Sequence, residues 1–276
     1  KPTIANVAEL AGVSQATVSR ALRGATNVTE ETRIKVQRAA DQLNFTLSKS
    51  ASALASGKTM RVILLVSGKL NEWFNSGVLQ GVYEELAPVG YDVTPAFITD
   101  RSELDRFFSQ LPKSRNADAI IISSFQLMPA MRDQLQAIDL PTVGVNVPAE
   151  SGYFDASISI DNSSAMTMAV RLLRSLGHTN IAFCSDYIPA DMVYNTSQRT
   201  QAFADAAQAN ATDGITFSLL TADAHDAPLS KSDLASQLTA KLLSLPERPT
   251  AVCVETDQVA IALVKELRKQ QLNVPE

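Results

Sequence analysis

The stretch TIANVAELAGVSQATVSRAL, residues 3–22, decides how the N-terminal part of the chain folds. Apolar residues recur in it at helical spacing in two short runs, and Gly12 interrupts the pattern between them. Thr3 and Ser14 precede the two runs, and both are N-cap residue types because their hydroxyls accept hydrogen bonds from the free amides of a first turn. The stretch therefore predicts two short helices joined by a glycine-containing turn, which is the layout of a helix-turn-helix.

A third helix is expected after the loop at residues 23–27. Thr29 is its predicted N-cap, and the acidic pair Glu30 and Glu31 suits the positive end of a helix dipole. Its predicted core face consists of Val36, Ala39, Ala40 and Leu43. We therefore expect residues 1–44 to form a small all-α domain of three helices.

The predicted second helix carries a surface suited to DNA. Its outward residues are small or polar and none is acidic; they are Ser14, Gln15, Ala16, Thr17, Ser19 and Arg20. Small side chains let a helix lie deep in the major groove, while Gln and Arg are long enough to reach base edges. The pattern alone also allows a solvated polar face in some other three-helix unit.

The segment NVTEETRIKVQRAADQLNF at residues 27–45 continues the pattern, and together with residues 3–22 it closely resembles the headpiece of the LacI/GalR family of bacterial repressors. The match is dense and in register, so it is far more specific than a short motif. The resemblance implies that Gln15 and Ala16 contact bases, with Arg20 beside them. It also implies that the DNA backbone is contacted by Ser14, Thr17, Ser19, Asn27 and Thr32.

Residues 45–58, FTLSKSASALASGK, are rich in Ser, Ala and Lys and are expected to form a hinge. An isolated helix of this length is marginal in water, so order here requires a packing partner. The resemblance implies that the segment becomes a helix on the operator and that Leu54 wedges between base steps in the minor groove. The alternative for Leu54 is a linker residue packed against the rest of the chain.

Several residues depart from the family pattern. Asn6 stands where the family usually has Asp, which concerns a cap or a contact within the headpiece. Leu47 and Ser52 replace a proline and an arginine of the hinge. The first replacement loosens the entry to the hinge, and the second removes one contact to a phosphate or a groove.

Charge is distributed unevenly along the chain. Residues 1–58 hold eight Lys or Arg and four Asp or Glu, a net charge of +4, so with −5 overall the remainder carries −9. A basic end on an acidic body favours a nucleic-acid reader with a separate sensor. The expected partners are palindromic double-stranded operator DNA, a second copy of the chain and a small-molecule effector. No membrane partner is expected, since no apolar run approaches the roughly 18 residues of a span.

From Arg61 onward, short β-branched apolar runs alternate with amphipathic helical segments. This alternation predicts an α/β core with parallel sheets covered by helices on both faces. Two series meet near residues 146–156, so we expect an N-terminal lobe over 59–148 and a C-terminal lobe over 149–276. The layout resembles the two-lobed periplasmic-binding-protein-like core of the same family. Ligands of open α/β sheets bind at the carboxyl ends of the strands, which makes the cleft between the lobes the expected effector site.

Six residues are predicted to bind the effector: Trp73, Phe74, Asn146, Asp161, Arg199 and Asp257. By the resemblance, Arg199 and Asp257 align with residues that commonly grip the effector, and an aromatic residue near the first helix of the core lines the pocket. Arginine and aspartate together suit a hydroxyl-rich ligand, such as a sugar or a related polar metabolite. Trp73 and Phe74 are equally compatible with packing under their loop, and Asp161 with capping the helix that follows it. Asn146 stands where the family often has Asp, which leaves the effector class open.

The sequence carries no pattern typical of an enzyme. His178 and His225 are its only histidines, and neither lies near a nucleophile motif. His178 is instead expected to satisfy the end of a helix. Cys184 and Cys253 lie in apolar segments without metal-ligand spacing and are expected to be buried and reduced. We therefore expect no metal and no cofactor other than the effector.

The runner-up function is a sugar-binding receptor module of the secreted type, without a DNA function. The N-terminus KPTIANVAEL lacks the layout of a secretory signal, which disfavours this alternative and favours a cytoplasmic protein bound to the bacterial nucleoid through DNA. The last residues, QQLNVPE, resemble a point at which the family continues, so the second lobe is expected to be incomplete.

Overall fold

A computed structural model describes residues 2–46, 57–114, 116–137, 140–147, 153–187, 193–211, 214–224 and 229–275. Leu54 and His225 lie outside the described residues, as does most of the expected hinge. The chain divides into two compact units, one of Lys1–Ile63, Gln80–Thr94 and Ser114–Ala119 and the other of Leu64–Leu79, Pro95–Lys113 and Ile120–Glu276. The domain boundaries expected from the sequence stay predictions.

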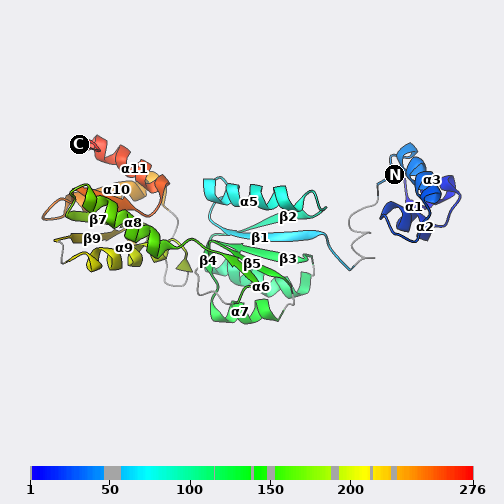
Figure 1. Ribbon diagram of the computed structural model, residues 1–276, viewed down its shortest axis with the longest axis horizontal. Helices are drawn as coiled ribbons and strands as arrows, with labels where there is room; N and C mark the ends of the chain where they lie inside the picture. Colours follow the sequence, from blue (N-terminus) through cyan, green and yellow to red (C-terminus); the bar gives the residue numbers. More distant parts are fainter. Residues whose placement is uncertain are drawn as a thin grey trace. The chain divides into compact units, whose positions relative to one another are not determined.

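Three helices form at the N-terminus (Figure 1): α1 (Ile4–Ala11), α2 (Gln15–Leu22) and α3 (Glu30–Gln42). Each predicted N-cap is confirmed, because the side chains of Thr3, Ser14 and Thr29 accept hydrogen bonds from backbone amides three residues ahead. Gly12 ends α1 in the left-handed conformation with a φ of 67°, where a side chain would be strained. Local signals therefore define where these helices begin and end.

The three helices bury a small apolar core. Val7, Val18 and Val36 are fully buried, and Ala8, Ala21, Ala39 and Ala40 surround them. Leu43, predicted in the same core, is half-buried because it lies at the C-cap of α3. The small all-α headpiece expected from the sequence is thereby confirmed.

Asn6 completes the cap of α1. Its Oδ1 accepts a hydrogen bond from the backbone N–H of Thr3 at 3.0 Å, while Thr3 accepts one from the backbone of Asn6 in return. The departure from the Asp that is usual in the family therefore leaves this cap intact.

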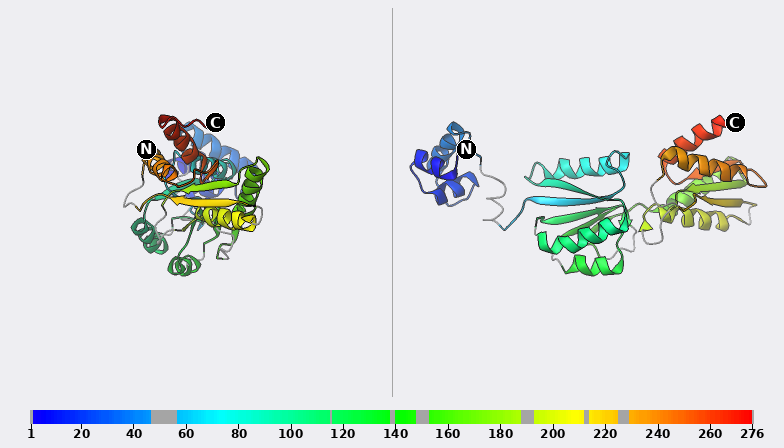
Figure 2. Two further views of the ribbon diagram at one scale, coloured as in Figure 1. Left: turned by 90° about the vertical axis from the view of Figure 1, so that its left-hand side faces the viewer. Right: turned by 180° about the vertical axis from the view of Figure 1, so that it is seen from behind.

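The middle of the chain forms a five-stranded sheet in the order β2-β1-β3-β5-β6. Its strands are β1 (Arg61–Ser67), β2 (Asp92–Ile98), β3 (Ala119–Ser123), β5 (Thr142–Val145) and β6 (Ala156–Ile158). Residues 62–66 of β1 are all buried, as in a strand covered on both faces. The cover comes from α5 (Trp73–Leu86) on one face and from α6 (Arg101–Ser114) and α7 (Pro129–Gln136) on the other (Figures 1 and 2).

A second, parallel sheet follows in the order β10-β7-β9, with β7 (Asn180–Ser185), β9 (Thr216–Thr221) and β10 (Ala251–Val254). Its helices are α8 (Asn162–Ser175), α9 (Ser197–Ala209), α10 (Lys231–Leu243) and α11 (Asp257–Lys269). Alternate residues of β7 face opposite sides: Ile181 and Phe183 pack against α8 and α9, whereas Ala182 and Cys184 pack against α10 and α11. Both sheets confirm the predicted α/β core.

Three elements were not predicted. Helix α7 follows Met128 and has Pro at its start, where the missing amide is harmless, and it buries Met131 and Leu135 one turn apart. Strands β4 (Phe125–Gln126) and β8 (Val193–Tyr194) pair antiparallel. Strands of two residues are too short to show a periodic pattern in the sequence.

Both cysteines are free, and they differ in burial. Cys184 is free and buried, and burial raises the pKa of its thiol to about 12, with a smaller effect from nearby Cys253. Cys253 is free but half-buried, so full burial was wrong for it, because β10 lies at the edge of its sheet. The backbone N–H of His178 donates to Leu173 O at the end of α8, as expected, while its ring Nδ1 lies 3.0 Å from Thr250 Oγ1.

In the described part of the chain, no helix has both the length and the apolar character needed to cross a bilayer. Nor do three or more His, Cys, Asp or Glu side chains of that part come together in a way that could hold a metal ion.

Candidate functional site

One face of α2 presents the residues predicted to meet bases. Gln15, Ala16 and Arg20 are exposed, and helical geometry places them side by side. Ser19, predicted to contact the DNA backbone, lies on the same face and is half-buried. No carboxylate occurs within α2, so the helix itself offers nothing that repels phosphate.

Hydroxyl pairs stand at the starts of α2 and α3. Ser14 Oγ lies 2.9 Å from Thr17 Oγ1, and Thr29 Oγ1 lies 2.9 Å from Thr32 Oγ1. Helix N-termini carry partial positive charge, and hydroxyls can donate, so both starts suit a phosphate oxygen. Asn27 is exposed in the loop before α3. Apart from Ser19, the residues predicted to contact the DNA backbone thus lie at or just before two helix starts.

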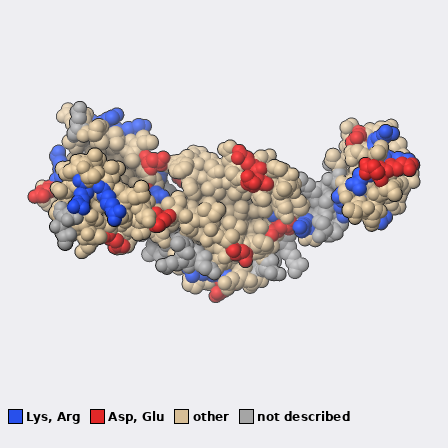
Figure 3. Space-filling model, in the orientation of Figure 1, with Lys and Arg blue, Asp and Glu red and all other residues tan. Residues whose placement is uncertain are grey.

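Arg20 folds back along its own helix. Its Nε donates to Ala16 O at 3.3 Å in an exposed, local bond that is easily exchanged for a base or a phosphate. The carboxylates Glu30 and Glu31 belong to α3, where Arg33 and Lys35 pair with them at 3.4 and 2.8 Å. Figure 3 shows the carboxylates of the headpiece gathered mainly in one patch of the face in view.

Three of the predicted effector residues contact one another. Trp73 Nε1 donates to Asp257 Oδ1 at 3.2 Å, and the indole meets the ring of Phe74 edge-on at 5.7 Å between centroids. Trp73 is 62% exposed, so its indole is not packed under the loop, which was the alternative. The structure therefore joins an aromatic pair to an acceptor at the start of α11.

Arg199 is held by two neutral acceptors. Its Nε donates to Asn162 Oδ1 at 3.0 Å and its Nη1 to the backbone O of Glu255 at 2.6 Å. No carboxylate among the described residues pairs with it, so its charge is not compensated by an ion pair there. A guanidinium held in this way keeps donors for a polar ligand.

Buried amides link Arg199 to Asn146. Asn162 Nδ2 donates to the backbone O and the Oδ1 of Asn195, both at 3.2 Å, and Asn195 Nδ2 donates to Asn146 Oδ1. Asn146 in turn donates to Ser124 Oγ at 3.3 Å. The three asparagines are at most 8% exposed, so each needs these partners. Sequence reasoning missed Asn162 and Asn195, because a single Asn next to a helix start reads as a cap or turn residue.

Asp161 has a capping role at α8. Its Oδ1 accepts from the backbone N–H of Ser164 at 2.9 Å and its Oδ2 from the Ser164 hydroxyl at 2.7 Å. These two bonds, the backbone bond first, lower the pKa of Asp161. The contacts thus support helix capping, the alternative given for Asp161 above, and an effector role for Asp161 stays a prediction.

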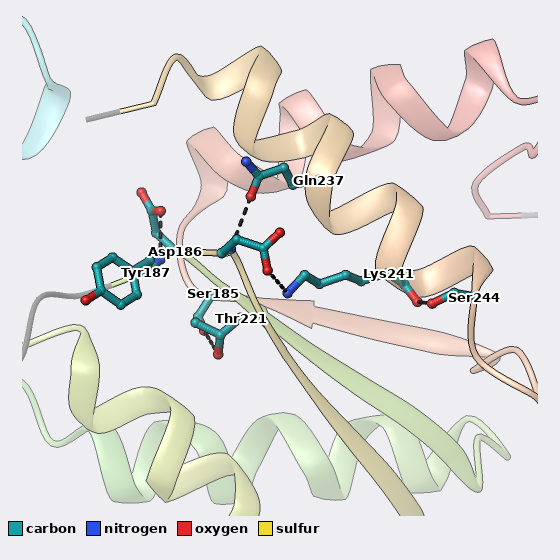
Figure 4. Close-up of polar contacts among 8 residues, drawn as sticks. Ser185, Asp186, Tyr187, Thr221, Gln237, Lys241 and Ser244 are labelled. Atoms are coloured by element: carbon teal, nitrogen blue, oxygen red, sulfur yellow. Dashed lines mark hydrogen bonds and ion pairs between the residues drawn. The ribbon is translucent and has the colours of Figure 1, made fainter. Parts of the chain in front are cut away.

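A further polar group lies at the carboxyl ends of β7 and β9 (Figure 4). The last residues of the two strands, Ser185 and Thr221, have their hydroxyl oxygens 3.1 Å apart. Beyond β9, Asp223 accepts from Lys241 Nζ at 2.7 Å, and its backbone N–H donates to Gln237 Oε1 at 3.1 Å. Ligands of open α/β sheets bind at this end of the strands, and the sequence did not single out these side chains.

Family models match both ends of the chain. Residues 3–48 match bacterial regulatory proteins of the lacI family, and residues 170–276 match the periplasmic binding protein-like domain. The HTH-type transcriptional repressor PurR of Vibrio cholerae serotype O1 (strain M66-2) is 30% identical over 277 residues, which cover 99% of this chain and 79% of that protein.

Two solved structures share the fold. The lac repressor dimer bound to operator and the anti-inducer ONPF has a TM-score of 0.80 at 22% identity, covering 99% of this chain and 80% of that one. The complex of the transcriptional regulator CelR with cellobiose has a TM-score of 0.61 at 24% identity, covering 100% of this chain and 80% of that one.

Proposed function

The chain belongs to the LacI family of bacterial regulatory proteins, and on this premise we propose that it is a repressor whose dimer binds a palindromic operator under the control of a small polar effector. It is a transcription regulator with an effector-binding domain and not an enzyme. The proposal places it in the bacterial cytoplasm, on DNA.

The exposed face of α2 is the observation that carries sequence-specific binding. In the proposal, Gln15 and Ala16 read base edges in the major groove, and Arg20 leaves Ala16 O to join them. The DNA backbone is contacted by Ser14, Thr17, Ser19, Asn27 and Thr32. Leu54, outside the described residues, enters as a minor-groove wedge on the family resemblance alone.

A two-fold dimer is the arrangement that suits a helix-turn-helix protein. Two headpieces related by a two-fold axis meet two half-sites of opposite direction, which makes the operator a palindrome. The lac repressor structure, which has the same fold, is a dimer on its operator. We assign the headpiece to residues 1–44, the hinge to 45–58 and the two lobes to 59–148 and 149–276, and the effector acts by ordering or melting the hinge.

The polar groups described above suit a hydroxyl-rich effector. Arg199 offers donors, Asp257 and Asn146 offer acceptors, and Trp73 with Phe74 offers an apolar surface for the C–H face of a sugar ring. Cellobiose in the CelR complex supports the sugar class for the shared fold. A ligand of this kind both donates and accepts hydrogen bonds.

Selection of bound sequences from a random double-stranded DNA pool, at fixed salt, tests the DNA side. We expect a palindrome with two half-sites and an affinity that falls steeply with added salt, because phosphate contacts release counterions. Arg20→Ala should relax the base preference, whereas Lys35→Ala, whose ammonium already pairs with Glu31, should leave it unchanged. An unenriched pool, or an affinity independent of salt, would contradict the proposal.

The effector side can be tested with the intrinsic fluorescence of Trp73, the only tryptophan of the chain. Titration with a panel of mono- and disaccharides should change the emission for at least one sugar, because the indole leaves Asp257 for the ligand. Arg199→Met should abolish that change, and Arg174→Met, at the far end of α8, serves as the matched control. If no sugar alters the emission or the melting temperature, the sugar class is wrong.

A further inference from the structure

Asp118, just before β3, holds two consecutive residues at the entrance to β1. Its Oδ1 accepts from the backbone N–H of Thr59 at 2.7 Å and from the Thr59 hydroxyl at 2.9 Å. Its Oδ2 accepts from the backbone N–H of Met60 at 2.9 Å. Three donors from adjacent residues thus converge on the two oxygens of one half-buried carboxylate.

The backbone fixes the same short segment from both neighbouring strands. Met60 O accepts from the N–H of Asp92 at 2.9 Å, beside β2, and Arg61 O accepts from the N–H of Asp118 at 2.8 Å, beside β3. Met60 also has a φ of 52°, the left-handed region that non-glycine residues rarely adopt. Such a conformation persists where the surroundings over-determine it, and here five hydrogen bonds do so.

Asp118 keeps its negative charge at neutral pH. Burial opposes ionisation, but the hydrogen bonds from Thr59 and Met60, together with the positive charge of Lys58, lower its pKa below the ordinary value. The ionised form accepts from all three donors at once, which a neutral amide could not do, because an amide has one oxygen and a donor in place of the other.

The hydrogen bonds that hold Thr59 and Met60 to Asp118, here called a clamp, lie at a point of the chain that suggests their role. Thr59 directly follows residues 45–58, the hinge that the proposed function assigns to DNA binding, so the covalent path from the core to the headpiece runs through Thr59 and Met60. We propose that Asp118 is a positioning residue for operator binding, which fixes the end of the hinge to the core sheet. This inference rests on the proposed function. A fixed hinge end reduces the conformational freedom that must be lost when the headpieces and the hinge bind DNA.

The same sheet contains a matched clamp that does not adjoin the hinge. Asp155 Oδ2 accepts from the backbone N–H of Thr142 at 2.7 Å and from its hydroxyl at 3.0 Å, at the entrance to β5. The chemistry, an Asp that holds the amide and hydroxyl of a Thr at a strand start, is that of Asp118 with Thr59. Asp118 accepts one further hydrogen bond, from the backbone N–H of Met60. The difference that the test uses is that the hinge precedes Thr59 along the chain and does not precede Thr142.

The test compares Asp118→Ala with Asp155→Ala in the full chain. Each variant is melted, and its dissociation constant is measured on the DNA sequence selected by the wild-type chain. Both should lower the melting temperature, since each removes a clamp of the sheet. Asp118→Ala alone should weaken DNA binding, by about threefold to thirtyfold, the range expected when a residue outside the contact surface couples to a site.

Thr59 supplies a milder pair of variants in case Asp118→Ala does not fold. Thr59→Val removes one of the three donors and should weaken DNA binding by a few-fold, whereas Thr59→Ser keeps all three and should bind as the wild type does. Equal DNA affinity in Asp118→Ala and Asp155→Ala, or in Thr59→Val and Thr59→Ser, would overturn the positioning role while leaving the proposed function in place. A wild-type chain that selects no DNA would overturn both.

Discussion

The headpiece and the effector region are built from contacts of opposite range. In the headpiece, the described residues predicted to contact DNA lie on α2 or at its N-cap, in the loop before α3 and at the start of α3, and each helix start is defined by a hydroxyl three residues from the amide it caps. In the effector region, Trp73 contacts Asp257, 184 positions away, and Arg199 contacts Asn162 and Glu255. The proposed DNA-reading surface thus lies within about twenty residues of the chain, whereas the candidate effector site is formed by segments spread over the rest of it.

The two regions should also differ in how much stability a single substitution costs. A change in the headpiece removes one local bond from one helix. A change among the buried side chains of the second sheet leaves several partners exposed to a void or without a hydrogen bond. Each of the following variants tests that distinction.

The largest effect is expected for Phe203→Ala. Phe203 is fully buried and packs against Phe183 at 5.1 Å and Phe217 at 6.4 Å between ring centroids. Its truncation should lower the free energy of unfolding by about 3–5 kcal/mol, because it removes apolar contact and leaves a cavity. Urea denaturation followed by circular dichroism measures the loss. Phe97→Ala, at a ring that is 40% exposed, should have a much smaller effect, and equal losses would contradict the packing described.

The second largest effect is expected for Asn162→Ala, which should lower the free energy of unfolding by about 1–3 kcal/mol. The substitution leaves Arg199 Nε without its acceptor and Asn195 without its donor, both in a buried network. Asn210→Ala is the matched control, because Asn210 makes one local bond, from its Nδ2 to Ala206 O, at a helix end. If the two variants unfold at the same urea concentration, the amide network contributes no more than an ordinary cap.

Ser14→Ala sharpens the comparison from the headpiece side. The loss of the cap of α2 should lower the stability of the headpiece by about 1 kcal/mol, as N-cap substitutions commonly do. Ser14→Asn, which restores a capping oxygen, should recover most of the loss. Hydrogen exchange resolved by residue should place the change in α1–α3, and increased exchange in β7 or β9 would argue against a local effect.

The smallest effect is expected for the stability that the Asp161 cap loses when the pH is lowered. The folded-state pKa of Asp161 lies below its ordinary value of 3.8, because Ser164 hydrogen-bonds to the carboxylate. Its contribution to stability is therefore complete above about pH 4 and is lost as the pH falls through the lowered pKa. Asp161→Asn keeps a capping oxygen but does not titrate. Its melting temperature should therefore fall less steeply between pH 5 and 3 than that of the wild-type chain, by the contribution of one carboxyl group. An unchanged slope would mean that the cap does not depend on charge.

The sequence predicted the parts of the molecule that depend on neighbours in the chain. Thr3, Ser14 and Thr29 were identified as caps because the amides they bind are three residues away. The central strands β1 and β7 were recognised from their apolar runs, since strands covered on both faces of a parallel sheet are buried along their length. Helix α7 was missed because its two buried apolar residues, Met131 and Leu135, cover a single turn and make too short a periodic pattern.

The contacts of the candidate effector site could not have been derived in the same way. Spacing along the chain says nothing about whether Asn195 meets Asn146 or Asn162, because the fold alone brings these segments together. The family resemblance supplied Trp73, Arg199 and Asp257 as candidates, but not the bond that joins the first to the last. Asp161 shows the opposite case, since its capping contacts were visible as an alternative from the sequence itself.

The amide network has a direction, which Arg199 and the backbone O of Asn195 set together at Asn162. An asparagine amide can be turned over, so a run of asparagines alone could be read from either end, but a guanidinium only donates. Asn162 must therefore accept from Arg199 with its oxygen, which obliges it to donate to Asn195; Asn195 then donates to Asn146, and Asn146 to Ser124. Two groups that cannot be turned over, the guanidinium and the backbone carbonyl, thus orient every amide in the series. Removing the guanidinium from Asn162, by mutation or by a ligand that binds it, takes away one of these two constraints and leaves the Asn195 backbone O as the group that sets the direction from Asn162 to Ser124.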